Sequence, residues 1–159
     1  MRRYASVEIE GIDRIVIGVR DMDRALAFFG GVLGVKFTEL EGPITAAVGL
    51  RLAISFDKKL ELISPVGTPQ VVTNPPDPLE LARRLEAAPG DAVLYALTFK
   101  VADVDAAVAH ARRSGVRSTG QAFCVPHEPN LGIRDFTEVA LEEADTLGIK
   151  VAFAGYRRC

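Results

Sequence analysis

The chain has 159 residues, of which 48% are apolar and 25% are charged, as in an ordinary globular protein with one hydrophobic core. Its net charge of −2 comes from acidic and basic residues mixed along the chain, which excludes the basic tract of a nucleic-acid-binding protein. No stretch approaches the roughly 18 consecutive apolar residues of a membrane span, so we expect no membrane partner and a cytoplasmic location.

The first half of the chain shows a strand, a helix and three more strands. Residues Ile12–Val19 are mostly β-branched and apolar, which predicts a strand. Asp21 is a good N-cap, apolar residues at helical spacing predict a helix over 22–33, and Gly34 ends it. Turn residues separate three further expected strands, at 35–40, 44–56 and 59–64.

The middle of the chain predicts a connection that ends in a helix. Residues 66–76 are rich in Pro, Gly and Thr, which is typical of a loop. Asp77-Pro78 followed by Glu80 combines an N-cap, a proline at the first helical position and an acidic first turn. We therefore expect a short helix over 78–88.

The second half repeats the order of elements in the first. Residues 92–101 predict a strand, and Asp103 caps a helix expected over 104–114 and ended by Gly115. Three more strands are expected, at 119–125, 134–141 and 148–155. The last three residues, 157–159, are interpreted as a frayed tail.

The two halves also share a sequence pattern. Residues 15–25 align with 97–107 without a gap, and both stretches contain Val-x-Asp-x-Asp where the strand meets the helix. This repeat predicts two βαβββ modules related by a pseudo-twofold axis. A Rossmann fold is disfavoured, because several closely spaced strands follow each helix and no Gly-rich phosphate loop is present. We expect one α+β domain over 1–159, with modules at about 10–65 and 92–156 and a connecting loop and helix at 66–91.

Three segments carry a family resemblance: Ile12 to Gly34, Leu60–Pro65 and Asp145–Ile149. In this order they resemble the vicinal oxygen chelate superfamily of glyoxalases, bleomycin-resistance proteins and extradiol dioxygenases. The resemblance implies two βαβββ modules whose curved mixed sheets surround a central cavity. It also implies a homodimer.

Members of that family typically hold a divalent metal with four side chains, on the first and last strands of each module. Carried over to this chain, the resemblance places these positions at Arg14, Glu61, Ala96 and Ala152. Only Glu61 offers a ligand atom, since arginine is permanently charged and has no lone pair for a cation. One carboxylate is not a transition-metal site. We therefore predict a divergent member with no metal and no other cofactor.

Strand alternation indicates which residues face the expected cavity. Val16 shares a face with Arg14, and Thr98 shares a face with Ala96. We expect specificity to lie in the segments 44–56 and 121–136. The predicted ligand-binding residues are Arg14, Val16, Glu61, Ala96, Thr98, Ala152 and His127.

His127 is placed in this set because of its segment. Residues 124–130 contain two prolines and are expected to form a loop that can reach the mouth of the cavity. A Cys124–His127 nucleophile pair would require a cleft and an orienting third group, so a structural or exposed role is favoured for His127 and a small core residue is favoured for Cys124.

Two interpretations of Arg14 and Glu61 are open. In the first interpretation, the two side chains form an internal ion pair in place of the metal. In the second, they contact an anionic or carbonyl-bearing ligand. The first functional hypothesis is a metal-free protein that binds a small, partly apolar molecule. The alternative is a lyase, isomerase or dioxygenase-like enzyme, with an unrecognised metal site or with Arg14 polarising a carbonyl while Glu61 moves a proton.

Overall fold

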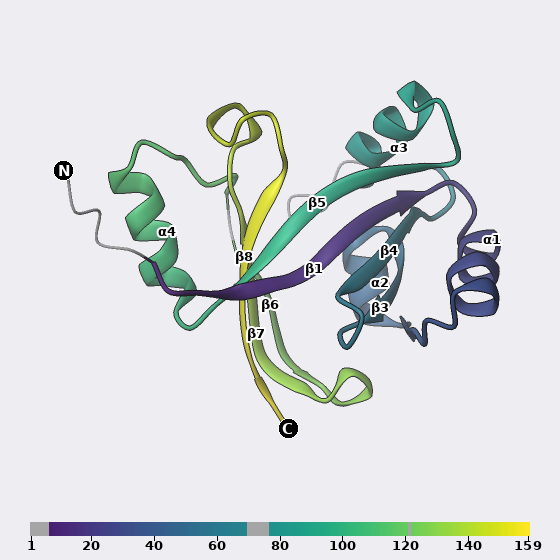
Figure 1. The fold of residues 1–159 in the computed structure, drawn as a ribbon, viewed down its shortest axis with the longest axis horizontal. Helices are drawn as coiled ribbons and strands as arrows, with labels where there is room; N and C mark the ends of the chain where they lie inside the picture. The colour runs from purple at the N-terminus through teal and green to yellow at the C-terminus, as the bar shows by residue number, and fades with distance from the viewer. Residues whose placement is uncertain (1–6, 70–76, 121) are drawn as a thin grey trace. The chain divides into compact units, whose positions relative to one another are not determined.

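The computed structural model describes residues 7–69, 77–120 and 122–159 and has a mixed α+β fold, as the sequence predicts (Figure 1). It divides into two compact units: the first is Arg14–Tyr95, and the second combines Met1–Asp13 with Ala96–Cys159. Residues 70–76 of the predicted connection, and Gln121, lie outside the described residues. Among the described residues, no helix is long and apolar enough to cross a membrane.

The first unit is a sheet with helices. Strand order is β2-β3-β4-β1, with β4 parallel to β1 and antiparallel to β3. Its elements are β1 (Ile9–Val19, which starts in the second unit), α1 (Met22–Leu26), the π-helix η1 (Ala27–Val32), β2 (Thr38–Leu40), α2 (Pro43–Val48), β3 (Leu50–Ser55), β4 (Leu60–Pro65) and α3 (Pro78–Ala87).

The helix starts form where the sequence predicts them, because the N-caps make their hydrogen bonds. The Asp21 side chain accepts from the Arg24 backbone N–H at 3.0 Å, and that of Asp77 accepts from Leu79 N–H at 2.8 Å. Pro78 follows Asp77 at the first helical position, where a missing N–H costs nothing.

The two faces of this sheet have different surroundings. Val16 is in register with Glu61, and Ile17 with Leu62. Ile17, Val19 and Leu62 pack against α1 and η1, as strand alternation predicts for the two β1 residues. The opposite face carries Arg14, Val16 and Glu61, all of them buried.

The predicted strand over 44–56 is wrong in its first part. Residues Pro43–Val48 form the helix α2, and the strand begins only at Leu50. Pro43 suits the start of a helix, since its fixed φ is helical and its missing N–H is not needed there. Gly49, with φ of 65°, ends the helix and turns the chain into β3. The β-branched residues in this stretch misled the sequence interpretation.

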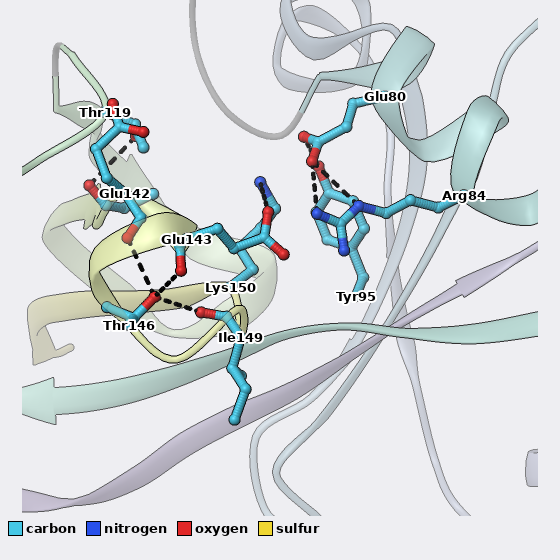
Figure 2. A network of polar contacts seen from close by, with 10 residues as sticks. Glu80, Arg84, Tyr95, Thr119, Glu142, Glu143, Thr146, Ile149 and Lys150 are labelled. Carbon is cyan, nitrogen blue, oxygen red and sulfur yellow. Dashed lines mark hydrogen bonds and ion pairs between the residues drawn. The ribbon is translucent and has the colours of Figure 1, made fainter.

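A polar cluster ties α3 to the start of β5 (Figure 2). The Tyr95 hydroxyl donates to Glu80 at 3.1 Å, and Arg84 donates to the other oxygen of the same carboxylate at 2.8 Å. Burial, with the Glu80 charge next in importance, raises the pKa of Tyr95, so this phenol stays protonated and remains a donor.

The second unit repeats the arrangement of a sheet under a helix. Strand order is β5-β8-β7-β6, with β8 parallel to β5. Helix α4 buries Val104, Ala107, Val108 and Ala111 against the sheet. The elements are β5 (Ala92–Val101, which starts in the first unit), α4 (Val104–Arg113), β6 (Phe123–Glu128), the 3₁₀ turn η2 (Pro129–Leu131), β7 (Ile133–Ala140), the 3₁₀ turn η3 (Glu143–Asp145) and β8 (Val151–Arg158).

Two strands of this unit are displaced toward the C-terminus relative to the prediction. β6 starts at Phe123 and runs through Pro126 and His127, so the expected loop at 124–130 is mostly strand. Proline is tolerated there because β6 is the last strand in the sheet order. β8 reaches Arg158, so Arg157 and Arg158 belong to the sheet and not to a frayed tail.

The turn before β8 is held by polar contacts (Figure 2). The Thr146 hydroxyl lies 2.6 Å from the Ile149 carbonyl oxygen and within hydrogen-bond reach of two preceding carbonyls. The Asp145 carboxylate accepts from the Arg117 backbone N–H at 3.0 Å and from its Nε at 2.8 Å. These bonds fix a turn in which Leu147 has a positive φ of 62° and is 95% exposed.

The Asp145 bonds predict a pH effect. Hydrogen bonds from the Arg117 side chain, then from its backbone, lower the pKa of Asp145 to about 2. Because the folded pKa is the lower one, the stabilisation is complete above roughly pH 4 and is lost as pH falls toward 2. We expect Arg117→Gln to raise the pKa of Asp145, measured by NMR titration of the carboxyl carbons. The pKa of Asp57, lowered first by its bond from Ser55, is the internal control and should not change. An unchanged Asp145 pKa would contradict this assignment.

Candidate functional site

Arg14 and Glu61 form an ion pair inside the first unit. Neighbouring parallel strands bring them together: Val16 on β1 is in register with Glu61 on β4, and Arg14 precedes Val16 on the same face. Arg14 Nη1 lies 3.3 Å from Glu61 Oε2, and the two side chains are only 4% and 12% exposed. The guanidinium carbon also lies 5.7 Å from the centre of the Phe56 ring. The predicted contact is confirmed, and its burial favours the interpretation as an internal ion pair.

The residues at the four inherited metal positions do not fit a divalent metal. The guanidinium of Arg14 occupies one position and forms an ion pair with the carboxylate of Glu61 at the second. Ala96 and Ala152 supply no donor atom at the other two. Within residues 7–69, 77–120 and 122–159, no group of three or more His, Cys, Asp or Glu side chains could hold a metal ion.

In the second unit, Ala96, Thr98 and Ala152 share one face of the sheet. Thr98 and Ala152 are register partners on the parallel strands β5 and β8, and Ala96 lies two residues before Thr98. All three are buried. They present methyl groups and one hydroxyl, which suits an apolar environment.

The same face of the second unit carries a cluster that the sequence interpretation missed. Tyr156 stacks on Phe136 with ring centres 5.9 Å apart, and Lys100 Nζ lies 4.9 Å from the Tyr156 ring centre. The Tyr156 hydroxyl donates to the buried Asp13 carboxylate at 2.5 Å, and Lys100 pairs with Glu10 at 3.2 Å. Strand alternation places Lys100 on this face with Ala96 and Thr98, but nothing in the sequence indicates its contact with Tyr156. These contacts link the beginning of β1 to β5, β7 and β8.

A groove of about 620 Å³ opens in the first unit. Its apolar part includes Leu50 and Leu52, and Leu52 is in register with Ile63, so the groove and the ion pair lie on the same face of the sheet. The expected specificity segment 44–56 supplies much of the lining. The full lining is Glu39, Leu40, Glu41, Gly42, Thr45, Ala46, Gly49, Leu50, Arg51, Leu52, Val66, Thr68 and Pro78.

The polar rim of the groove is held in place by charge pairs. Arg51 donates to Asp23 and to Glu39, each at 3.0 Å. The hydrogen bond to Glu39 raises the pKa of Arg51, so its positive charge is permanent. None of the seven predicted ligand-binding residues lines this groove.

Cys124 and His127 do not form a nucleophile pair. They lie three residues apart on β6, so their side chains point to opposite faces. Both are exposed, so the interpretation of Cys124 as a small core residue is wrong. Its sulfur lies 3.8 Å from the Thr137 hydroxyl.

Comparison with known proteins agrees with this architecture. Methylmalonyl-CoA epimerase from Mycobacterium tuberculosis superimposes with a TM-score of 0.68 at 19% identity, covering 95% of this chain and 91% of that one. A hypothetical protein from Bacillus halodurans gives a TM-score of 0.68 at 18% identity, covering 93% and 95%. A variant of Streptomyces coelicolor methylmalonyl-CoA epimerase, in complex with 2-nitronate-propionyl-CoA, gives a TM-score of 0.64 at 20% identity, covering 93% and 98%.

Comparison by sequence gives one result for curated proteins and one for protein families. No curated protein matches the chain. The model of one family matches residues 13–130, which span both units and include Arg14 and Glu61. The chain therefore belongs to the Glyoxalase/Bleomycin resistance protein/Dioxygenase superfamily.

Proposed function

We propose that this chain is a metal-free member of its superfamily that binds a small, partly apolar molecule. The observation that carries the proposal is the buried Arg14–Glu61 ion pair, which stands where the family resemblance places metal ligands. A cation cannot share that carboxylate with a guanidinium 3.3 Å away without strong repulsion.

The ligand is proposed to lie on the face of the first unit that carries Arg14, Val16 and Glu61. The groove on this face supports the proposal, since its volume falls within the roughly 300–1,000 Å³ range of small-molecule sites. An apolar interior with a few polar groups at the rim is the usual design of such sites. Within the second unit, the buried face that carries Ala96, Thr98 and Ala152 is proposed separately as an apolar ligand contact.

The experiment compares two matched substitutions with the apolar probe anilinonaphthalene sulfonate. Val66→Asp places a charge in the wall of the groove, whereas Leu94→Asp places the same charge outside it. Both side chains are more than half exposed, so both variants should fold. We expect only Val66→Asp to weaken probe binding, by about tenfold or more. If both variants bind the probe equally well, the groove is not the ligand site.

Metal analysis tests the other part of the proposal. Protein purified without chelator should contain no stoichiometric zinc, iron or manganese. Stoichiometric metal that disappears in Glu61→Ala would overturn the metal-free proposal.

The second candidate is an isomerase, favoured within the wider alternative of lyases and dioxygenases by structural neighbours that are methylmalonyl-CoA epimerases. Here Arg14 would polarise a carbonyl and Glu61 would move the proton at the adjacent carbon. Glu61→Gln discriminates the candidates, because it abolishes turnover of an epimerase and only shifts affinity in a binding protein. Methylmalonyl-CoA is the first substrate to assay. A cytoplasmic homodimer completes the proposal, and light scattering tests its stoichiometry.

A further inference from the structure

The interior of the groove in the first unit is aliphatic. Leu40 on β2 and Leu52 on β3 are register partners, and Leu50 lies two residues before Leu52, so the three leucines share one face of the sheet. Val66 and Pro78 extend this apolar lining. Among the described residues that line the groove, none is aromatic. A ring would therefore find no ring to stack on, whereas an alkyl chain finds aliphatic contacts along the leucines.

The polar rim of the groove carries more negative than positive charge. Its charged lining residues within the described ranges are Glu39, Glu41 and Arg51. The Arg51 guanidinium already donates to Glu39 and to Asp23, each at 3.0 Å. Glu41 is exposed, and in the part of the chain that the structure describes its side chain makes no hydrogen bond or ion pair. A ligand therefore meets a carboxylate that is available and a guanidinium that is already shared by two carboxylates.

A hydroxyl on α2 has the same hydrogen-bonding character. Thr45 lines the groove and donates its proton to the Gly42 carbonyl oxygen at 2.9 Å. A hydroxyl that has used its proton still has a lone pair for a ligand, so Thr45 can only accept from it. The Glu41 carboxylate is likewise an acceptor. Both groups favour a ligand that donates hydrogen bonds, and both disfavour a carboxylate or a phosphate.

We propose that the groove takes an aliphatic molecule whose polar end donates hydrogen bonds and carries no negative charge, as in an alkylamine or an alkyl alcohol. This inference rests on the proposed function and names the ligand class of its groove. Esters of coenzyme A carry negatively charged phosphate groups, so they are disfavoured at this groove by the same charges.

The test is an NMR titration of the intact chain at neutral pH and low ionic strength, which follows the methyl signals of Leu40, Leu50 and Leu52. The probes are octylamine, octanol and nonanoate, which share an octyl chain and differ in the charge of the polar end. We expect octylamine and octanol to bind, and octylamine to bind about tenfold more tightly than nonanoate. Hexylamine should bind about fourfold more weakly than octylamine for each methylene group that it lacks.

Glu41→Lys is the diagnostic variant, and Glu86→Lys is its matched control. Both replace an exposed glutamate of the first unit, but Glu86 lies on α3 and is not part of the groove lining. Glu41→Lys should weaken octylamine binding and strengthen nonanoate binding, while octanol changes least. A partly unfolded variant would lose affinity for all three probes, so opposite changes identify the charge of the rim as the cause. Glu86→Lys should leave the three affinities unchanged.

Three outcomes would overturn the inference. If nonanoate binds at the leucines as tightly as octylamine, the groove takes alkyl chains without regard to charge, and the proposed function stands. If Glu41→Lys and Glu86→Lys have the same effect, the preference comes from the general charge of the chain. If no probe shifts the leucine methyl signals at millimolar concentration, the groove is not a ligand site and the proposed function fails there as well. The comparison of Val66→Asp with Leu94→Asp uses one anionic probe throughout, so its result does not depend on this inference.

Discussion

Replacing Arg14 with methionine should lower the free energy of unfolding by about 3–5 kcal/mol, because it leaves the carboxylate of Glu61 buried without its cation. The double variant Arg14→Met with Glu61→Leu should recover much of this loss, since replacing a buried pair by apolar residues is often nearly neutral. Urea denaturation of the three variants measures both effects as a double-mutant cycle.

Arg51→Met is the control for this cycle. Arg51 also pairs with two carboxylates, but its side chain is 43% exposed. Exposed pairs contribute only about 0–1 kcal/mol, so this variant should stay close to the unchanged protein. The contrary result is that Arg14→Met leaves the free energy of unfolding unchanged and abolishes ligand binding. That result would identify Arg14 as a ligand contact and would contradict its interpretation as a stabilising internal ion pair.

Replacing Leu81 with alanine should cost about 2–5 kcal/mol, the usual range for a fully buried leucine. Leu81 of α3 packs on Gly18 of β1, where the strand has no side chain. A Cβ built on Gly18 would lie 2.4 Å from Leu81 Cδ1, so the helix sits as close to the strand as glycine allows. The cavity left by Leu81→Ala lies at this contact, and thermal or urea unfolding measures its cost.

The same contact predicts a rescue. Gly18→Ala alone should destabilise the fold by about 1–3 kcal/mol through overpacking. In Gly18→Ala with Leu81→Ala, the new methyl group enters the space that leucine left, so the double variant should lose less than the sum of the single variants. Gly31→Ala is the matched control, because no atom lies within 4 Å of the added Cβ and the stability should not fall. Additive losses would show that the two residues are not coupled.

Local signals in the sequence predict a large part of this fold. Asp21, Asp77 and Asp103 each start a helix, and each accepts the expected hydrogen bond from the backbone. Strand alternation also places Ile17 and Arg14 on opposite faces. A helix that escaped prediction is α2, because the six residues Pro43–Val48 are too few to show a helical period.

Of the candidate site contacts, one could be predicted from the sequence and others could not. The Arg14–Glu61 pair follows from the family resemblance, and its 3.3 Å contact confirms the prediction. The contacts of Tyr156 with Phe136 and Lys100 could not be predicted from the sequence, because only the strand register brings these three residues together. The register in turn depends on a bulge at Asp135 that no turn residue announces.

The outer strands of the two sheets have a consequence for assembly. An unpaired strand edge is a template on which another chain can add a strand and begin to aggregate. β2 ends the sheet of the first unit and is only three residues long, which offers few backbone groups to such a neighbour. β6 ends the sheet of the second unit and contains Pro126, which has no N–H to donate to an incoming strand. Both edges are therefore poor templates for strand addition. If this chain self-associates, we expect the interface to be formed by side-chain packing and not by backbone hydrogen bonds between edge strands.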